Sequence, residues 1–245
     1  MQKTLTQKIK GTIKILETSG INGCITGSSL LDCDFDSWNN PPDIDVFVYS
    51  ENSFINAIDI MRYRYGFKPG TTDASTANGE QWKIDRTIKF GMKRNASLST
   101  VKLNLDGVVV NVSYRKGQTT VLDVISNFDM SIIMRGYDIP KGTMLDLRTM
   151  ASTENVAVPN PLRDQDAEVY VTDQWIRQFD RVIKYWDRGF DTRPMARFYI
   201  KLINDTIDKG SLFKTSKSVE FFDEFSKEFM SVREKIELWL EDKEN

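Results

Sequence analysis

Apolar residues recur with two different periods along the first two thirds of the chain. Within residues 5–16 and 53–65 they are spaced by three and four positions, so both segments are predicted to be amphipathic helices. Elsewhere they occur in short runs or alternate with polar residues, which is typical of strands. Strands are predicted at 23–26, 43–49, 82–90, 99–105 and 108–114. The pair Asp106-Gly107 between the last two favours a tight hairpin turn.

The last third of the chain shows helical spacing throughout. Pro159 and Pro161 mark the change of pattern. The helices expected beyond them are 168–188, 192–207 and 217–242. Small polar residues at 69–81 predict a loop, and 119–125 predicts a short helix. We therefore expect an α+β fold, in which a mixed-sheet domain precedes an all-helical domain. The expected domains are 1–160 and 161–245.

The composition narrows the possible chemistry. The 245 residues carry 33 Lys and Arg against 35 Asp and Glu, a net charge of −2, and 40% are hydrophobic, as in an average globular protein. The chain has no histidine, which excludes Ser-His-Asp and Cys-His nucleophile systems and imidazole zinc sites. Catalysis would have to use carboxylates, amides, hydroxyls, lysine or arginine.

Localisation follows from what the sequence does not contain. Cys24 and Cys33 are the two cysteines, and thiols at this spacing form neither a disulfide framework nor a four-ligand zinc site. The first residues alternate lysine with apolar side chains, unlike a signal peptide. No run of eighteen apolar residues suggests a membrane span. We expect a cytoplasmic protein with no membrane partner, and the sequence does not indicate its oligomeric state.

Candidate chemistry is concentrated between residues 23 and 49. Asp43 and Asp45 stand two apart on a predicted strand, so their carboxylates share a face. Two neighbouring carboxylates repel each other, and a divalent cation with oxygen ligands relieves that repulsion. The preceding Gly27-Ser28 turn offers backbone N–H groups and a hydroxyl to phosphate. Taken singly these are ordinary turns and strand ends, but their order favours metal-assisted nucleotidyl transfer.

The segments Ile25–Ser28 and Asp43–Val46, with fourteen residues between Ser28 and Asp43, resemble the signature of the nucleotidyltransferase superfamily. This superfamily includes DNA polymerase beta, poly(A) polymerases and CCA-adding enzymes. The resemblance implies a polymerase-beta-like α/β mixed-sheet domain in which Asp43 and Asp45 are catalytic and bind Mg²⁺. It also implies that Gly27 and Ser28 bind the nucleotide. The third acidic position of the family should lie within 108–112, where this chain has Asn111.

Two later segments resemble the poly(A) polymerase and CCA-adding branch and its uncharacterised relatives in bacteria and phages. Val124–Ile132 resembles an Asp-Phe-Thr motif whose aspartate supports the nucleotide pocket, and Arg181–Phe190 resembles a helix that ends in Arg-Gly-Phe. In that helix, Lys184 with Arg181 would neutralise the charge that develops on pyrophosphate. The residues that this resemblance assigns to nucleotide binding are Asp129, Arg181, Lys184 and Tyr185.

Two basic stretches suit a triphosphate, an RNA backbone or both. Residues 83–116 carry a net charge of +6 and residues 177–217 one of +5, whereas 218–245 carry −5. One helix face in the second stretch is basic, as solvated helices often are. This face carries Arg177, Arg181, Lys184 and Arg188. Three aromatic side chains are candidates for stacking on a base, and core packing is the alternative for each. They are Trp38, Tyr137 and Tyr185.

The sequence therefore predicts a Mg²⁺-dependent nucleotidyltransferase that moves a nucleoside monophosphate from a triphosphate such as ATP to a hydroxyl, with release of pyrophosphate. RNA or tRNA is slightly favoured as the acceptor over small molecules and protein hydroxyls. The alternative is a degenerate member that binds nucleotide, RNA or protein without catalysis, with Asn111 in place of the lost carboxylate. A third possibility is a structural module in which Asp43 and Asp45 only cap a strand.

Overall fold

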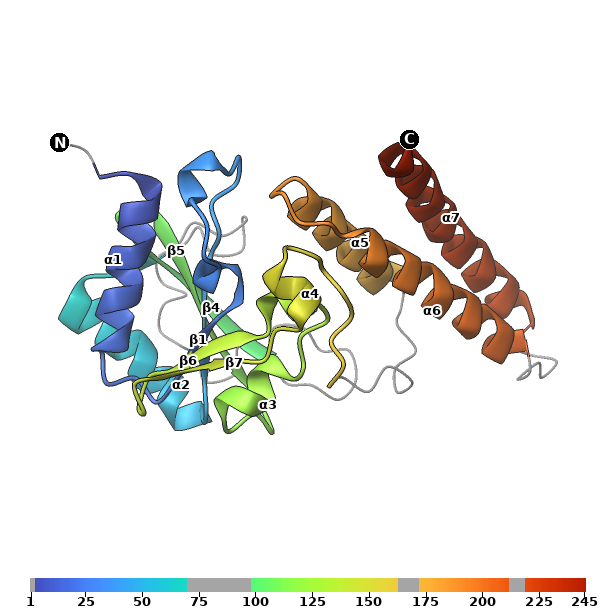
Figure 1. Cartoon of the computed structure of the whole chain (residues 1–245). Coiled ribbons are helices and arrows are strands. Elements are labelled where there is room, and N and C mark those ends of the chain that lie inside the picture. The colour runs from blue at the N-terminus through green and yellow to red at the C-terminus, as the bar shows by residue number, and fades with distance from the viewer. Residues whose placement is uncertain (1–2, 70–97, 163–171, 212–218) are drawn as a thin grey trace. The chain divides into compact units, whose positions relative to one another are not determined.

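The computed structural model divides the chain into two compact units (Figure 1). It describes residues 3–69, 98–162, 172–211 and 219–245. The first unit comprises Met1–Phe128 and Ile133–Leu147, and the second comprises Asp129–Ile132 and Arg148–Asn245. The division after Leu147 comes earlier than the boundary at 160 that the prolines suggested, because residues 130 and 156–160 bridge to one another and to Asp191 within the second unit.

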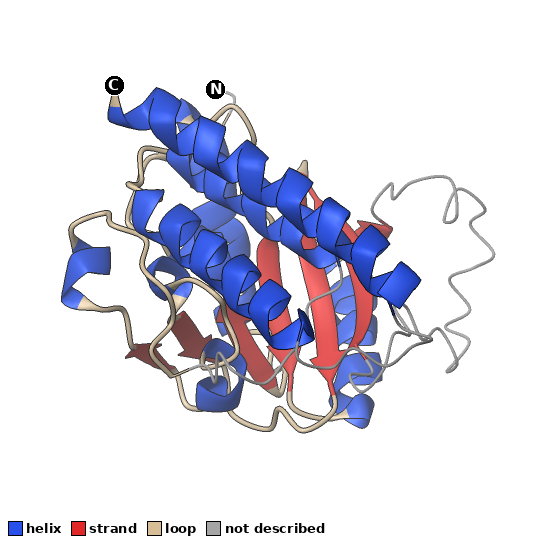
Figure 2. Cartoon of the chain, turned by 90° about the vertical axis from the view of Figure 1, so that its right-hand side faces the viewer, coloured by secondary structure: helices blue, strands red, loops and turns tan. Residues whose placement is uncertain are grey.

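The first unit is built on a mixed sheet of seven strands, counted over the described residues (strands in red in Figure 2). The strand order is β3-β4-β5-β2-β1-β6-β7. Neighbouring strands are antiparallel except β2 and β5, which run parallel at the centre. The strands are β1 (Gly23–Thr26), β2 (Ile44–Val48), β3 (Lys68–Pro69), β4 (Leu98–Leu105), β5 (Val108–Arg115), β6 (Arg135–Asp138) and β7 (Thr143–Asp146).

Local sequence signals explain where the helices of this unit begin. Helix α1 (Leu5–Glu17) starts at a capping box in which Thr4 and Gln7 bond reciprocally. Helix α3 (Val121–Ile125) has the same device, and the N–H of Thr119 in particular lowers the pKa of Asp123 by donating to its carboxylate. The remaining helical segments are α2 (Glu51–Asp59), a π-helical turn at Ile60–Arg64, and 3₁₀ turns at Gly27–Leu30 and Phe35–Ser37. A further 3₁₀ turn, Ser131–Ile133, lies where the chain passes from the second unit to the first.

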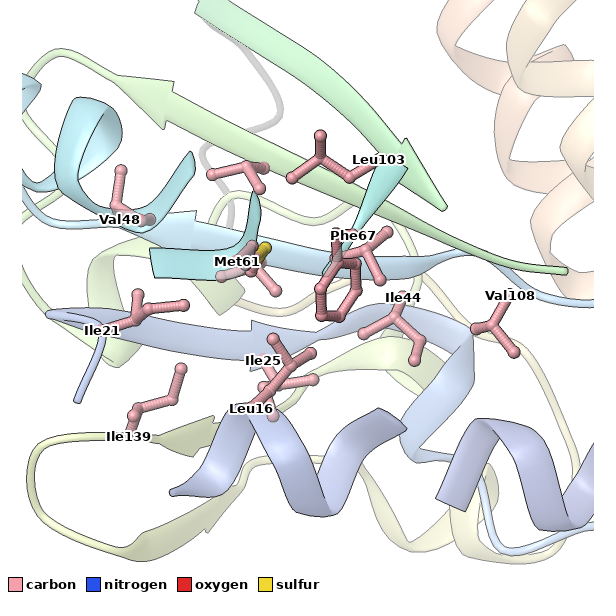
Figure 3. Packing of buried hydrophobic residues seen from close by; sticks show 14 of the residues in the cluster. Leu16, Ile21, Ile25, Ile44, Val48, Met61, Phe67, Leu103, Val108 and Ile139 are labelled. Carbon is pink, nitrogen blue, oxygen red and sulfur yellow. The ribbon is translucent and has the colours of Figure 1, made fainter. Parts of the chain in front are cut away.

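The main hydrophobic core lies on one face of the sheet, between the strands and helices α1 and α2. Figure 3 shows Leu16 of α1 beside Ile25 of β1, with Ile44 of β2 close by. These three side chains are 0% exposed. On the opposite face α3 packs against β6 and β1, in a smaller cluster that includes Cys24 and Phe47. Next to this cluster, the same face carries the polar residues Asp45 of β2 and Asn111 and Ser113 of β5.

The second unit is helical. Its helices are α4 (Met150–Thr153), α5 (Thr172–Trp186), α6 (Arg193–Ser211) and α7 (Val219–Glu244). Edge-to-face aromatic contacts join α5 to α7, where Trp239 meets Phe179 at 6.0 Å and Trp186 at 5.5 Å between ring centroids. None of the helices in the described ranges combines the length and apolar character that crossing a membrane requires.

The observed elements confirm the coarse prediction of an α+β fold with a helical C-terminal region. The predicted turn is also confirmed, since Asp106 and Gly107 have φ values of 53° and 88°, as a type I′ hairpin requires. The β6–β7 hairpin was not predicted, because its two four-residue strands are rich in polar residues and show no apolar alternation. The predicted strand at 82–90 and most of the predicted loop at 69–81 lie outside the described residues.

Candidate functional site

The fold brings Asp43, Asp45 and Asn111 together on the polar face of the sheet. Asp45 lies on β2 and is paired directly with Asn111 on the parallel strand β5, and Asp43 stands two positions earlier on the same face. The Asn111 amide nitrogen donates to Asp43 Oδ2 at 3.2 Å and to Asp45 Oδ1 at 3.0 Å. Residues 68 positions apart in the chain thus form one polar cluster.

The orientation of the Asn111 amide follows from electrostatics. Two carboxylates are acceptors, so the amide must present its N–H₂ end to them, because its oxygen would add a third acceptor to the cluster. Its other end, Oδ1, is buried and accepts no hydrogen bond from the described part of the chain. Such an atom is costly to leave without a partner. Asn111 therefore screens the two carboxylates from each other and holds an unused oxygen beside them.

The turn that follows β1 approaches the same carboxylates. Gly27 has φ +81°, and a Cβ placed on it would lie 2.7 Å from Asp45 Oδ2, so only glycine fits here without displacement of the carboxylate. Thr26 is paired with Asp45 across β1 and β2, is 0% exposed, and its Oγ1 has no hydrogen-bond partner among the described residues. Ser28, in the same turn, is also buried.

These oxygen atoms suit a small divalent cation. Asp43 and Asp45 supply negative charge. Next to them lie two buried oxygens, Thr26 Oγ1 and Asn111 Oδ1, which have no hydrogen-bond partner among the described residues. Among the described residues, however, no group of three or more His, Cys, Asp and Glu side chains is placed to bind a metal. A cation here would be held by two carboxylates assisted by neutral oxygens. The donor chemistry therefore fits Mg²⁺ with a lower ligand charge than three carboxylates would give.

Asp129 belongs to the second unit, where it is a buried anchor. Its Oδ1 lies 2.9 Å from Arg181 Nη1 of α5, and the Tyr199 hydroxyl of α6 donates to Oδ2 at 3.2 Å. The backbone N–H of Asn160 donates to its carbonyl. The Asp129 side chain is 5% exposed and that of Arg181 is 37% exposed, so the carboxylate end of this ion pair is shielded from water. Asp129 joins two helices and a loop, and its predicted role near a nucleotide stays a prediction.

The other predicted residues of α5 differ in exposure. Lys184 is exposed, whereas Tyr185 is 4% exposed and its ring meets that of Phe190 at 5.8 Å. The Arg188 guanidinium lies over the Tyr185 ring, 5.6 Å from its centroid. The side chain of Arg177 lies outside the described residues. Tyr185 therefore adopts the core-packing alternative that the sequence left open.

The two other candidate aromatics also pack on the main core of the first unit. Trp38 meets Phe35 edge to face at 5.2 Å, and Tyr137 is half-buried against the same cluster. Their packing explains why these aromatics stand in otherwise polar segments. Both side chains are partly buried, and their role in stacking on a base stays a prediction.

Strand register adds residues that sequence reasoning missed. Lys102 of β4 is paired with Asn111, which is paired in turn with Asp45, and Asp45 with Thr26, so a single row crosses four strands. Ser113 and Thr100 extend the polar face and share a hydrogen bond of 2.9 Å. Alternation within 99–105 would have placed Lys102 on one of the two faces. Only the pairing of β4 with β5 shows that this face is the one that carries the carboxylates.

Comparison with known proteins returned no relative: no family model, curated protein or solved structure matches this chain. The nucleotidyltransferase family therefore remains a resemblance carried by short motifs. What the chain does has to be argued from the cluster formed by Asp43, Asp45 and Asn111 and from the turn at Gly27.

Proposed function

We propose that this protein is a Mg²⁺-dependent nucleotidyltransferase, with a polymerase-beta-like domain at its N-terminal side. It transfers a nucleoside monophosphate from a nucleoside triphosphate to a hydroxyl acceptor and releases pyrophosphate. The observation that carries this proposal is the placement of Asp43 and Asp45 against Asn111 and the Gly27 turn on one polar face. This placement agrees with the order of the motifs along the sequence.

The residues of the first unit divide the work of such a site. Asp43 and Asp45 hold Mg²⁺, which stabilises charge on the phosphoryl oxygens and activates the acceptor hydroxyl when it is bound. Asn111, which is paired with Asp45, would occupy the third ligand position with a neutral amide. The glycine at position 27 allows the turn to approach the Asp45 carboxylate, and Ser28 follows it directly. This turn would bind the triphosphate.

The cations of the proposal are those that the motif resemblance assigns to the helical unit. Lys184 is exposed and would neutralise the leaving pyrophosphate. Arg181 is already paired with Asp129, so its charge is partly used within its own unit. The basic stretches identified in the sequence support RNA or tRNA as the acceptor. The alternative, a nucleotide- or RNA-binding module without catalysis, is favoured by one observation, the missing third carboxylate at Asn111.

The first test measures thermal unfolding with each of the four ribonucleoside triphosphates, with and without Mg²⁺. Ligands that bind the folded state raise its stability by mass action. We expect a Mg²⁺-dependent increase in Tm that is lost in the Asp43→Ala/Asp45→Ala double variant. A Tm increase that persists in the double variant would place the nucleotide elsewhere and contradict the proposal.

The second test separates the enzyme from the binding module. Pyrophosphate release is measured with pooled RNA as the acceptor, for wild type and for Asn111→Asp. A wild-type rate that Asp43→Ala abolishes supports the enzyme. Release only by Asn111→Asp would show that the natural chain binds without catalysis. We expect Asn111→Asp to bind Mn²⁺ more tightly than wild type, because a carboxylate replaces an amide, and to lose stability without metal, because three carboxylates then repel.

A further inference from the structure

Arg135 joins three parts of the first unit that are far apart in the sequence. It is the first residue of β6, and its Nη1 donates to the carbonyl of Leu30 at 2.9 Å and to Asp32 Oδ2 at 2.8 Å. Its Nε lies 3.4 Å from Asp146 Oδ2 on β7, the residue with which it is paired across the two strands. The side chain is only 18% exposed.

Leu30 is the last residue of the 3₁₀ turn that begins at Gly27. The final carbonyls of such a turn have no partner within it, so a donor from outside fixes the position of its end. At the other end of the turn, Gly27 lies against the Asp45 carboxylate. Arg135 therefore holds one end of a four-residue segment whose other end contacts the candidate cation site.

The rest of the loop that follows this turn is fixed separately. The N–H of Leu5 donates to Asp36 at 2.8 Å, and the hydroxyl of Thr6 donates to Asp34 at 2.6 Å. The bond from Thr6 is the main reason that the pKa of Asp34 is lowered. Helix α1 therefore holds the distal part of the loop. Arg135 holds the part that lies next to the carboxylates.

We propose that Arg135 is a positioning residue for nucleotide binding, which holds the Gly27–Leu30 turn in the conformation that receives the triphosphate. This inference rests on the proposed function. Arg135 should therefore affect the affinity for triphosphate, and it should not affect the binding of a cation by Asp43 and Asp45. Arginine suits this role because its planar fork presents several donors at once, whereas lysine presents a point charge. Its two carboxylate partners, Asp32 and Asp146, keep the fork in place when anionic phosphate arrives.

The test compares wild type with Arg135→Met, Arg135→Lys and Asp32→Asn in the full chain. Arg233→Met is the matched control, because Arg233 is also partly buried at 29% exposure and bonds to Glu237 and Asn204, but within the helical unit. Calorimetry measures the affinity for a non-hydrolysable ATP analogue with Mg²⁺. Electron paramagnetic resonance measures the affinity for Mn²⁺ alone, and steady-state kinetics give KM and kcat.

For Arg135→Met we expect triphosphate affinity to fall on the order of tenfold with a matching rise in KM, because charge-assisted hydrogen bonds are lost. Mn²⁺ affinity and kcat should stay within about twofold of wild type, as should every parameter of Arg233→Met. The triphosphate affinity of Arg135→Lys should fall between that of wild type and that of Arg135→Met. Asp32→Asn should lose only about two- to threefold, since Asp32 is 78% exposed and the Leu30 contact remains.

Any one of four results would overturn this inference. One is wild-type triphosphate affinity in Arg135→Met. Another is an equal loss in Arg135→Met and Arg233→Met, which would indicate a general loss of stability. If Arg135→Met does not fold, Arg135→Lys decides, and wild-type affinity in that variant would count against the proposal. If wild type itself binds no triphosphate, the proposed function fails, and the role of Arg135 fails with it.

Discussion

At the start of strand β2 its two faces differ in chemistry, although the side chains alternate along five residues and Phe47, further along the strand, packs in the cluster under α3. Ile44, Val46 and Val48 point into the main core and are at most 1% exposed. Asp43 and Asp45 point the other way, are only half-buried, and bond to an amide rather than pack. The same contrast continues on β5, where Val110 and Val112 are buried on either side of Asn111.

Within one strand, the core face therefore contributes to stability and the opposite face carries the groups suited to chemistry. Burial of apolar surface is the main favourable contribution to folding, and around Asp43 and Asp45 it comes from the core face, whereas Phe47 packs under α3 on the opposite face. The opposite face carries two like charges and two buried oxygens that find no hydrogen-bond partner in the described part of the chain, a set of groups that costs stability unless a ligand uses them. Neighbouring residues of β2 should therefore respond to substitution in opposite ways.

The largest effect that tests this contrast comes from adjacent residues. Ile44→Ala should lower the free energy of unfolding by about 2–5 kcal/mol, because it removes a fully buried side chain and leaves a cavity. Asp45→Asn should change that free energy by less than about 1 kcal/mol, because the Asn111 N–H₂ still finds an acceptor. Asp45→Asn should instead abolish the Mg²⁺-dependent Tm increase.

Urea denaturation of the two variants, with Mn²⁺ binding measured on the folded protein, checks both expectations. Ile44→Ala should bind Mn²⁺ like wild type wherever it is folded. The contrast between the faces is wrong if Asp45→Asn unfolds as easily as Ile44→Ala, or if Asp45→Asn binds Mn²⁺ unchanged.

A smaller effect is expected where the turn meets the site. Gly27→Ala meets Asp45 Oδ2 at 2.7 Å and requires φ +81°, so we expect a loss of about 1–3 kcal/mol and weaker Mn²⁺ binding. Gly20→Ala is the matched control, since Gly20 has φ +77° with nothing within 4 Å of the added Cβ. Gly20→Ala should show the backbone cost alone and bind Mn²⁺ normally. Equal Mn²⁺ affinities in the two variants would remove the argument for contact between turn and site.

Local signals explain how much of this could be predicted from the sequence. Strands β1, β2, β4 and β5 follow from apolar runs and alternation, and the β4–β5 turn follows from its Asp-Gly pair. These patterns also indicated that Asp43 and Asp45 share a face. The motif resemblance pointed to Asn111, which the β2–β5 pairing places beside Asp45. The functional roles of these three residues stay predictions.

Contacts that depend on tertiary pairing could not be predicted from the sequence. Arg135 meets Leu30 and Asp32 across 105 and 103 positions, and no periodicity indicates such a partner. Lys102 joins the polar row only through strand register. For Tyr185 the sequence left base stacking and core packing open, and its ring packs against Phe190 after the chain turns back at residue 189. In each case the deciding contact joins elements whose pairing the sequence pattern does not specify.

The smallest expected effect concerns the reactivity of the two cysteines, which tests where the polar face of the sheet ends. Cys24 lies on the face of β1 that α3 covers, is 0% exposed, and burial raises the pKa of its thiol from 9.0 to about 12. Cys33 is half-buried in the loop after β1. A chromogenic disulfide reagent at pH 8 should therefore modify Cys33 in the folded protein, and both thiols in urea. Cys33→Ser should leave the folded protein without a fast-reacting thiol.

The same buried thiol gives a pH dependence of defined sign. The folded state retains the Cys24 proton up to about pH 12, whereas the unfolded chain releases it near pH 9.0. Stability contributed by this group is therefore complete below pH 9.0 and falls as the pH rises above it. Cys24→Ala should flatten this decline in urea titrations between pH 8 and 10, and Cys33→Ser should not. Rapid modification of Cys24 in the folded state would show that α3 does not cover this part of the sheet.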